Sequence, residues 1–232
     1  PGWRGVPVVV TSHTWENGKN EQSHQDPTLC EAMLGEMSDT ARVFFPVDAA
    51  TAVASLHAVY ASEGVIATLV VPKQEMPQLF NEADAHAAIQ AGYAVLQPAS
   101  PDVRIQLVAV GAYQVLEARR AARVLAKGGC PAQVVAVLEP GRLRMPRDRI
   151  ESDFVIAESQ LAEAFPANMA RVIVSHCRPE PMLGVLRRLD SGAARTRALG
   201  YINRGGTFDV EGMLFANQCT WAHIVQQAAQ AL

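Results

Sequence analysis

Short, continuous apolar runs rich in Val and Ile alternate along this chain with segments in which apolar residues recur at helical spacing. Strands that read as unbroken apolar runs are typical of parallel sheets covered by helices on both faces. The chain is therefore predicted to be an α/β protein. The eight candidate strands are Val6–Val10, Arg42–Phe45, Val65–Val71, Tyr93–Leu96, Arg104–Val110, Ala132–Leu138, Arg171–Ser175 and Arg197–Ile202. This number of strands suits two sheets better than one.

Helix signals lie between these runs. Asp48 is predicted to cap the amino terminus of a helix, and Gly64 is a stop signal beyond its end. Apolar stripes predict further helices over residues 115–125, with outward-facing arginines, and over residues 221–232. The last of these is expected to close the domain.

A proline-containing stretch without periodicity separates two halves of the chain. It reads QPASPDV and lies between Leu96 and Arg104. The predicted organisation is a first domain over residues 1–97, a linker over 98–104 and a second domain over 105–232. The chain starts at Pro1 and not at Met, which predicts a processed chain, a trimmed chain or a piece of something longer.

Composition excludes several classes of function. Of the 232 residues, 49% are hydrophobic and 19% charged, which is enough apolar material for one large or two modest cores. The net charge of -3 provides no basic surface for a nucleic acid. The longest apolar runs are far too short to span a membrane, and no signal peptide is recognisable.

The four cysteines are widely separated, with no CxxC pair. No metal site within this chain is predicted from them. They are interpreted as buried free thiols in a reducing compartment, which favours a cytoplasmic location.

The segment Thr11–Pro27 (TSHTWENGKNEQSHQDP) concentrates hydrogen-bonding side chains directly after a predicted buried strand. Open α/β sheets bind their ligands at the carboxyl ends of strands, so this segment is a candidate ligand site. An ordinary solvated loop has the same composition. The spacing of His13, Asn20 and His24 fits neither a metal site nor a catalytic triad closely enough to exclude that alternative.

The order of residues in this segment resembles the substrate-channel segment of phosphoketolases. The resemblance rests on Thr11–His13 and Ser23–Pro27, and transketolases have a related segment. In these families the second histidine of the segment and an acidic or amide residue four positions before it contact the sugar. The resemblance therefore assigns the catalytic role, through hydrogen bonds to the sugar or as acid or base, to His24, and substrate binding to Asn20.

The resemblance also implies substrate binding by two further residues of this segment. His13 and Gln25 belong to the same matching motifs and are expected to bind substrate. The resemblance is most specific for His24 and Asn20, to which it assigns contacts with the sugar.

The resemblance continues along the chain. Arg42–Ala49 is similar to the strand-to-helix passage that follows in both families, and Val70–Gln78 is similar to the strand end that carries a basic residue and a glutamine. That basic residue binds the sugar phosphate in the families and is Lys73 here. Gly200–Tyr201 and Gly205–Asp209 resemble phosphoketolases more than transketolases, and their glycines are expected to need positive φ angles.

Two positions depart from the phosphoketolase pattern. Lys19 stands where the family has a histidine, and Glu21 stands where it has a glycine. Lys19 is expected to contact a phosphate by charge but to move a proton less readily than imidazole, whose unperturbed pKa is about 6.5. Glu21 adds a negative charge beside an anionic substrate. The substrate of this chain can therefore differ from that of the family.

The resemblance implies cofactors that this chain does not hold by itself. In these families the glutamate that activates the thiamine cofactor precedes the segment at Thr11, and the metal motif lies further upstream. No Gly-Asp-Gly motif is present here. Thiamine diphosphate and Mg²⁺ are therefore expected to be bound mainly by residues outside this chain, in upstream domains or a separate subunit, within a homo-oligomer such as a dimer.

The implied fold is a partial pyrimidine-type parallel-sheet domain followed by a transketolase-type carboxy-terminal α/β domain. The implied reaction is the cleavage of xylulose 5-phosphate or fructose 6-phosphate with inorganic phosphate, which yields acetyl phosphate and an aldose phosphate. Two alternatives stay open. One is transketolase-like transfer of a two-carbon unit to another acceptor, and the other is a non-catalytic relative that binds or scaffolds.

Overall fold

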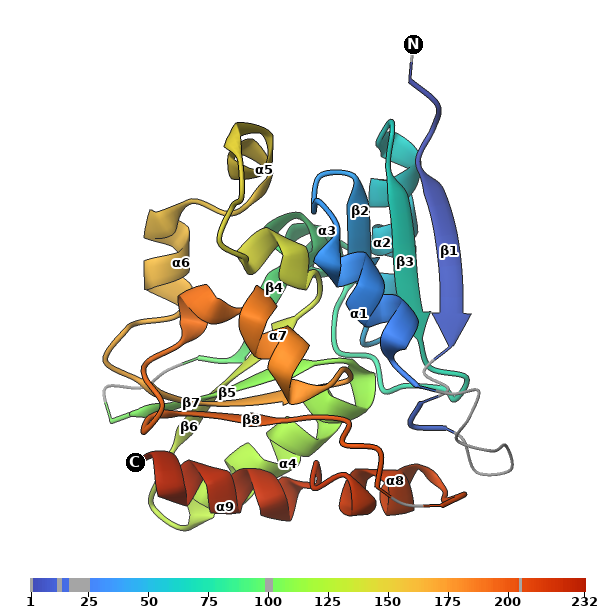
Figure 1. Ribbon diagram of the computed structural model, residues 1–232. Helices are drawn as coiled ribbons and strands as arrows, with labels where there is room; N and C mark the ends of the chain where they lie inside the picture. Colours follow the sequence, from blue (N-terminus) through green and yellow to red (C-terminus); the bar gives the residue numbers. More distant parts are fainter. Residues whose placement is uncertain (1, 12–13, 17–25, 99–101, 205) are drawn as a thin grey trace.

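The protein contains two β-sheets. The computed structural model describes residues 2–11, 14–16, 26–98, 102–204 and 206–232 (Figure 1). Three parallel strands form the first sheet, in the order β1-β3-β2: β1 (Val6–Thr11), β2 (Ala41–Phe44) and β3 (Ile66–Val71). Five strands form the second, in the order β4-β6-β5-β7-β8: β4 (Tyr93–Gln97), β5 (Ile105–Val110), β6 (Ala132–Val137), β7 (Ala170–Ser175) and β8 (Thr196–Leu199). The α/β class and the division into two sheets are confirmed.

The boundary between the sheets does not coincide with the predicted linker. β4 lies upstream of residues 98–104, yet it pairs antiparallel with β6, where Tyr93 faces Val137. The chain therefore passes from one sheet to the other between α3 (Glu82–Ala91) and β4. Linker residues 99–101 lie outside the described residues, and the division into domains at this linker stays a prediction.

Nine α-helices and two 3₁₀ turns connect the strands within the described residues. Besides α3, they are α1 (Thr28–Gly35), α2 (Ala49–Ala61), α4 (Ala112–Lys127), α5 (Arg149–Phe154), α6 (Glu158–Ala164), α7 (Pro179–Val185), α8 (Val210–Ala216), α9 (Trp221–Ala231), η2 (Pro140–Leu143) and η3 (Arg187–Leu189). Asp48 caps α2 as predicted, because its carboxylate accepts the Thr51 amide at 2.9 Å. Gly64, beyond the end of α2, has a φ of 69°.

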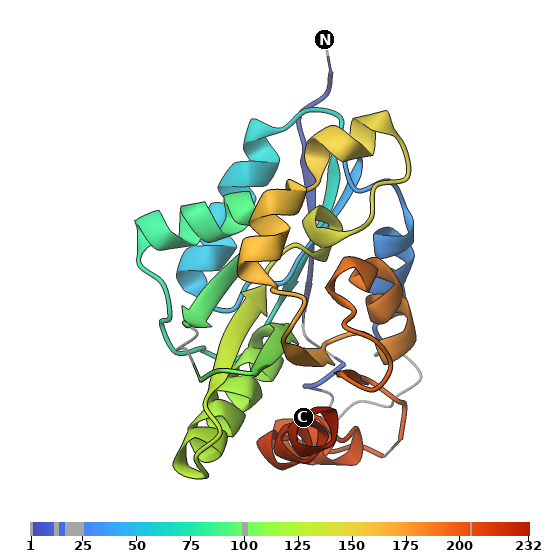
Figure 2. The ribbon, with the colours of Figure 1, turned by 90° about the vertical axis from the view of Figure 1, so that its left-hand side faces the viewer.

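Two apolar clusters fill the space between sheets and helices, and each contains residues of both sheets. Neighbouring residues of one strand point into different clusters, as Leu107 and Val108 of β5 do. Helices α2, α3, α4 and α9 contribute to the first cluster, and α1, α6 and α7 to the second. Figure 2 shows α2 and α3 on the opposite side of the sheets from α1 and α7. The two sheets therefore share both clusters of the interior.

Direct bonds also join the two sheets. The amide of Phe45, just after β2, donates to the carbonyl of Leu138, just after β6, at 2.8 Å. Beside this bond, Arg42 forms a two-pronged ion pair with the fully buried carboxylate of Glu139, at 2.7 and 2.8 Å. A buried carboxylate needs such a partner, so this pair fixes how the ends of the two sheets meet.

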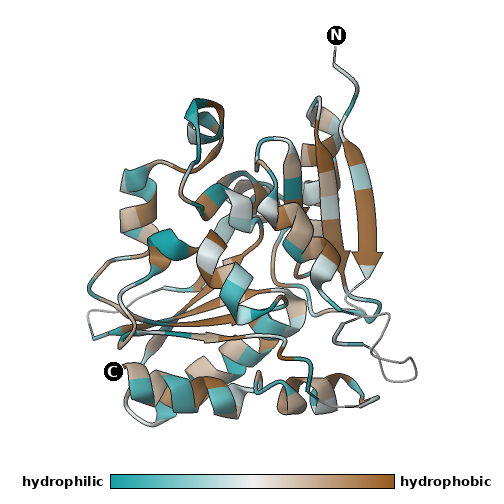
Figure 3. Cartoon of the chain, viewed as in Figure 1, coloured by the Kyte–Doolittle hydropathy of each residue, from teal (hydrophilic) through white to brown (hydrophobic). Residues whose placement is uncertain are grey.

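β1 forms one edge of the first sheet and carries an apolar surface. Among the described residues it pairs with β3 alone in the sheet. Val6, Val8 and Val9 are 46%, 38% and 57% exposed, and Figure 3 shows the hydrophobic colouring along this strand. Exposed apolar edge strands are ready templates for pairing with another chain segment.

The glycines near the carboxyl terminus do not behave as predicted. Gly200 and Gly206 lack positive φ angles, and Gly205 lies outside the described residues. Gly200 is instead required by close approach, because a Cβ atom there would lie 2.2 Å from the carbonyl oxygen of Cys177. No neighbouring atom comes within 4 Å of the corresponding position at Gly206.

Candidate functional site

The carboxyl ends of β1 and β3 lie side by side and bring two predicted site segments together. The strands are parallel, with Thr11 opposite Val71. β1 leads into the segment Thr11–Pro27, and β3 leads to Lys73, whose side chain is exposed. Ligands of open α/β sheets bind at such an edge. Lys73 therefore lies beside the described part of the candidate segment.

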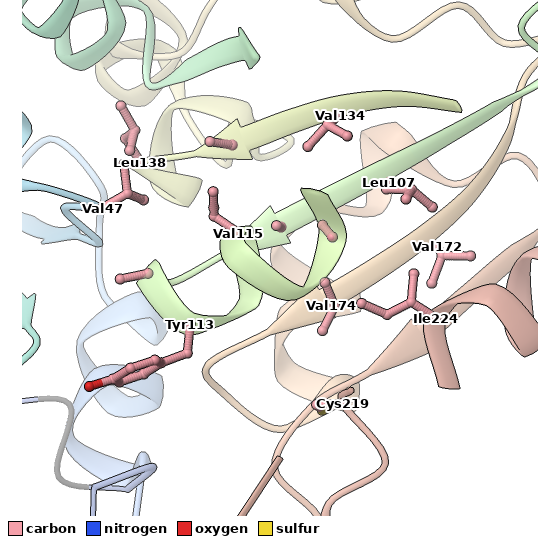
Figure 4. Packing of buried hydrophobic residues seen from close by; sticks show 14 of the residues in the cluster. Val47, Leu107, Tyr113, Val115, Val134, Leu138, Val172, Val174, Cys219 and Ile224 are labelled. Atoms are coloured by element: carbon pink, nitrogen blue, oxygen red, sulfur yellow. The ribbon is translucent and has the colours of Figure 1, made fainter. Parts of the chain in front are cut away.

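The Glu16 carboxylate connects that segment to the end of β3. It accepts the backbone amide of Lys73 at 2.9 and 3.1 Å and that of Gln74 at 3.3 Å. The hydroxyl of Tyr113, at the start of α4, donates to the same carboxylate. Tyr113 lies at the margin of the first apolar cluster with its hydroxyl directed out of it (Figure 4). Burial and the Glu16 hydrogen bond raise the pKa of Tyr113, so it remains a donor.

Trp15 anchors the same segment to the second sheet. Its side chain is fully buried, and its Nε1 donates to the carbonyl oxygen of His176, just after β7, at 3.1 Å. Its ring meets the rings of Tyr201 and His176 edge-on, with centroids 6.3 and 6.4 Å away. A large aromatic group with a satisfied polar atom holds the chain firmly in place.

Arg178 holds the other end of the segment. Its guanidinium pairs with Asp26 at 3.1 Å, and it also pairs with Glu31 of α1. Burial would raise the pKa of Asp26, but hydrogen bonds from Thr28 and the Arg178 charge lower it overall. Arg178 also lies over the ring of Tyr201, 5.5 Å from its centroid. Residues 16 and 26 are thus both held by side chains of the second half of the chain.

Most of the predicted site residues fall between these two anchors. Lys73 is the predicted site residue whose position the structure describes. The others, together with Glu21, lie outside the described residues: His13, Lys19, Asn20, His24 and Gln25. Their contacts with substrate stay a prediction.

A cavity of about 420 Å³ opens at the same edge, beyond β2 and β3. Pro46, Asp48, Val71, Gln74 and Glu75 are among its lining residues. The Asp48 carboxylate is occupied by the capping bonds of α2 and by two backbone amides, at 2.8 and 2.9 Å. The volume suits a small organic ligand. The carboxylates of Asp48 and Glu75 disfavour a phosphate inside the cavity.

The remaining histidines and cysteines do not assemble a second reactive centre within the described residues. No group of three or more His, Cys, Asp or Glu side chains there is able to hold a metal ion. His57 and His86 are exposed and stack with centroids 5.3 Å apart. His176 and Cys177 are buried beneath the anchored segment, and burial raises the pKa of the Cys177 thiol. All four cysteines are free thiols.

No described helix is both long and apolar enough to cross a lipid bilayer.

Sequence reasoning missed the anchoring residues. Trp15 and Glu16 lie inside the candidate segment but match no motif on which the resemblance was built. Tyr113 and Arg178 follow the strands β5 and β7, and their position after strand ends was the available signal. Their partners are 97 and 152 residues away in sequence, so the pairing itself required the fold.

The fold is that of transketolase-like α/β proteins. A transketolase from Pichia stipitis, solved in complex with xylulose 5-phosphate, superposes with a TM-score of 0.74 at 18% identity, over 97% of this chain and 30% of that one. A split-gene transketolase, described as an inactive β4 tetramer, matches with a TM-score of 0.70 at 18% identity, over 98% of this chain and 66% of that one. The predicted transketolase-like fold is confirmed.

The sequence relationship is with phosphoketolases. The family model described as D-xylulose 5-phosphate/D-fructose 6-phosphate phosphoketolase matches residues 1–62. A probable phosphoketolase of Bifidobacterium animalis is 25% identical over 217 residues, which cover 88% of this chain and 26% of that protein. The resemblance to the phosphoketolase family is therefore confirmed. The chain spans about a quarter of the length of this curated relative.

Proposed function

We propose that this chain is part of a thiamine-diphosphate-dependent phosphoketolase, a carbon–carbon lyase of carbohydrate metabolism, to which it contributes substrate-channel residues. The observation that carries the proposal is the sequence relationship to phosphoketolases along 88% of the chain. The substrate is xylulose 5-phosphate or fructose 6-phosphate, and inorganic phosphate captures the two-carbon unit as acetyl phosphate. The location is the cytoplasm.

The residues of this chain bind and orient the sugar phosphate. Lys73, exposed at the carboxyl end of β3, holds the phosphate, with Lys19 as a second cation. His24 hydrogen-bonds the sugar hydroxyls and acts as acid or base, and Asn20 orients the substrate. The anchors at Glu16 and Asp26 support this assignment, because they tie both ends of the segment 17–25 to the folded body.

Thiamine diphosphate, with Mg²⁺, supplies the electron sink for cleaving the carbon–carbon bond. The described residues do not fit this group by themselves, because they contain no cluster of three or more side chains able to hold a metal ion. In the proposal the cofactor is therefore held mainly by upstream domains or a separate subunit. The split-gene transketolase offers a parallel, since it is described as inactive in a tetramer of its β chains.

The edge of the first sheet supports the need for a partner. Val8 and Val9 of β1 are exposed, and β1 pairs with β3 alone among the described strands. A strand supplied by the cofactor-bearing partner would extend this sheet and cover that apolar surface. The full enzyme is then expected to be a homo-oligomer, such as a dimer, of the completed unit.

The test has two stages. Co-purification with intact-mass analysis first identifies a larger chain that carries the cofactor and travels with this one. The assembled proteins, with thiamine diphosphate and Mg²⁺, are then assayed for acetyl phosphate from xylulose 5-phosphate and inorganic phosphate. If no acetyl phosphate forms, but a new ketose phosphate does when an aldose phosphate replaces inorganic phosphate, the activity is a transketolase-like transfer. A chain that finds no cofactor-bearing partner and binds neither thiamine diphosphate nor sugar phosphate supports the non-catalytic alternative.

A matched pair of variants tests the assignment of Lys73. Lys73→Met removes the cation at the candidate site, and Lys127→Met removes an exposed cation at the far end of α4. Lys73→Met is expected to raise KM for the sugar phosphate by about tenfold or more, because a hydrogen bond to a charged group is worth about 1.5–3 kcal/mol. Equal KM values in both variants contradict the assignment.

A further inference from the structure

A second cavity lies beside the carboxyl end of β6, where Tyr93 of β4 pairs with the last residue of that strand. It has a volume of about 390 Å³ and is lined by residues of α3, β4, η2 and α6. No described residue lines both this cavity and the one beside Asp48. The volume suits a small organic ligand, so the polar lining decides which ligand the cavity is able to hold.

The Arg142 side chain lines this cavity without a hydrogen bond or an ion pair of its own in the described part of the chain. Its Nε atom is buried and unpaired. The Glu139 carboxylate acts on Arg142 through its charge, but both of its oxygen atoms accept hydrogen bonds from Arg42, at 2.7 and 2.8 Å. The guanidinium groups of Arg142 and Arg42 lie 5.0 and 5.4 Å from the centroid of the Phe154 ring. One carboxylate thus serves two cations, and a positive charge remains at the cavity wall.

The surroundings of Arg142 favour a further anion. Burial lowers the pKa of Arg142, and although the Glu139 charge raises it, the Arg42 charge lowers it again and the net direction is downward. A guanidinium group keeps its charge at neutral pH all the same. An anion that enters the cavity therefore offsets both the burial of this charge and its repulsion from Arg42.

The fold holds Arg142 in place without a ligand. Its carbonyl accepts the amide of Ile156 at 2.9 Å, and its amide donates to the carbonyl of Glu139 at 3.1 Å. Its stem lies against Gly92 at the end of α3, where an added Cβ atom would come 3.0 Å from the Cβ of Arg142. Because the backbone and the stem are already ordered, a ligand pays little entropy to fix this side chain.

Three other polar side chains of the lining make no hydrogen bond to any described residue. They are the Tyr93 hydroxyl and the amides of Gln90 and Gln160. Burial and the charge of Glu163 raise the pKa of Tyr93, so its hydroxyl remains a donor at neutral pH. The Tyr93 ring packs against Phe165, with centroids 5.4 Å apart, which fixes its orientation. The cavity therefore offers one cation and several neutral hydrogen-bonding groups.

We propose that this cavity binds a small organic carboxylate, with the carboxylate on the Arg142 guanidinium and an apolar body against Tyr93 and Ile156. The planar guanidinium matches a carboxylate through two parallel hydrogen bonds, and the single charge of the ligand balances the single unpaired cation. The Gln90 and Gln160 amides bind polar substituents of the ligand. This site lies apart from the candidate segment, and it does not depend on the proposed function.

Phosphate is the less suitable anion for this cavity. A phosphate group carries between one and two negative charges at neutral pH. Among the described residues, Arg142 is the one charged side chain in the lining. The carboxylates of Glu139 and Glu163 act on Arg142 and Tyr93 through their charges, so a second negative charge on the ligand would be repelled without a cation to offset it.

Calorimetric titrations of the purified chain with benzoate and with benzamide test the proposal, because these two probes have the same shape and differ in charge. Benzoate is expected to bind with a Kd of about 1 mM, a usual strength for a ligand of this size, and benzamide at least about ten times more weakly. Equal affinities for the two probes would overturn the proposal, and so would a lack of benzoate binding up to about 10 mM. Inorganic phosphate that binds more tightly than benzoate would refute the choice of a carboxylate.

A matched pair of variants tests the role of Arg142. Arg142→Met removes the guanidinium group and is expected to weaken benzoate binding by about tenfold or more, since a hydrogen bond to a charged group is lost. Arg104→Met removes an exposed cation that precedes β5, at the opposite end of the sheet, and is expected to leave the affinity within about twofold of wild type. If Arg142→Met does not fold, Arg142→Lys replaces it, and an affinity equal to that of wild type in the folded variant contradicts the assignment.

The position of the ligand has a separate readout. In nitrogen–proton correlation spectra, benzoate is expected to shift the amide resonances of Gln90, Tyr93 and Gln160 and to leave that of Lys73 unmoved. Shifts at Lys73 without shifts at the other three would place the ligand at the candidate segment and overturn the proposal. Neither result depends on whether the reconstituted protein forms acetyl phosphate.

Discussion

Glu151 is expected to make the stability of this protein sensitive to acid. Its fully buried carboxylate accepts the amides of Ser38 and Arg147 at 2.9 and 2.8 Å and the Arg147 guanidinium at 2.8 Å. Arg144 lies 3.6 Å away. Burial would raise the pKa of Glu151, but the Arg147 and backbone hydrogen bonds outweigh it and lower the pKa from 4.5 to about 2. Because Ser38 precedes β2 and Glu151 lies in α5, this carboxylate joins the two halves of the chain.

The contribution of Glu151 to the free energy of unfolding follows from the difference between its pKa values in the folded and unfolded states. A carboxyl group whose pKa is lower in the folded state stabilises that state above its unfolded pKa, and the stabilisation is lost as the pH falls. A shift from 4.5 to about 2 corresponds to about 3 kcal/mol at pH 7. Of this, about 1.4 kcal/mol is lost by a pH of about 3.5, and most of the remainder is lost by a pH of about 2. Glu151→Gln is therefore expected to cost about 3 kcal/mol at neutral pH and about 2 kcal/mol at a pH of about 3.5.

Urea unfolding followed by circular dichroism measures the free energy of unfolding of wild type and Glu151→Gln at both pH values, provided that the transitions are two-state. Glu158→Gln is the matched control, because the Glu158 side chain is 82% exposed and water solvates its carboxylate, while the Arg188 side chain with which it pairs is 6% exposed. It should change stability by less than about 1 kcal/mol at either pH. If wild type and Glu151→Gln lose stability in parallel as the pH falls, the reasoning from the buried carboxylate is refuted.

Other substitutions test the anchors around the candidate site. Trp15→Ala is expected to cost about 3–5 kcal/mol in urea unfolding, because it empties a fully buried site and removes the hydrogen bond that Nε1 donates to the carbonyl of His176; a cost below about 1 kcal/mol would contradict this packing. Gly111→Ala is expected to cost about 1–3 kcal/mol, since φ is 109° there and the new Cβ would lie 3.1 Å from the Cβ of His176; an unchanged Tm would refute the strain. Arg178→Met is expected to cost about 1–2 kcal/mol at low salt and less at high salt, because its pairs with Asp26 and Glu31 are partly exposed. A salt-independent loss would mean that packing, not charge, is the source.

Local sequence signals determined the elements of this fold. The runs rich in Val and Ile predicted all eight strands, and the physical reason is plainest in β5, β6 and β7, which are buried at every position and therefore favour apolar residues on both faces. Asp48 predicted the start of α2, because a capping side chain bonds amides only a few residues away. The resemblance to phosphoketolases was also readable, since it rests on short motifs in fixed order. Each of these signals is carried by neighbouring residues.

Tertiary structure alone decided how those elements meet. The sequence did not indicate that β4 joins the second sheet, because strand pairing depends on hydrogen bonds to a distant strand. In the same way, the donors around Glu16 come from the end of β3 and the start of α4, 57 and 97 residues away. Arg178 reaches Asp26 across 152 residues. The physical reason is that a site is defined by side chains that converge in space, and a long chain separation leaves no local periodicity from which that convergence can be read.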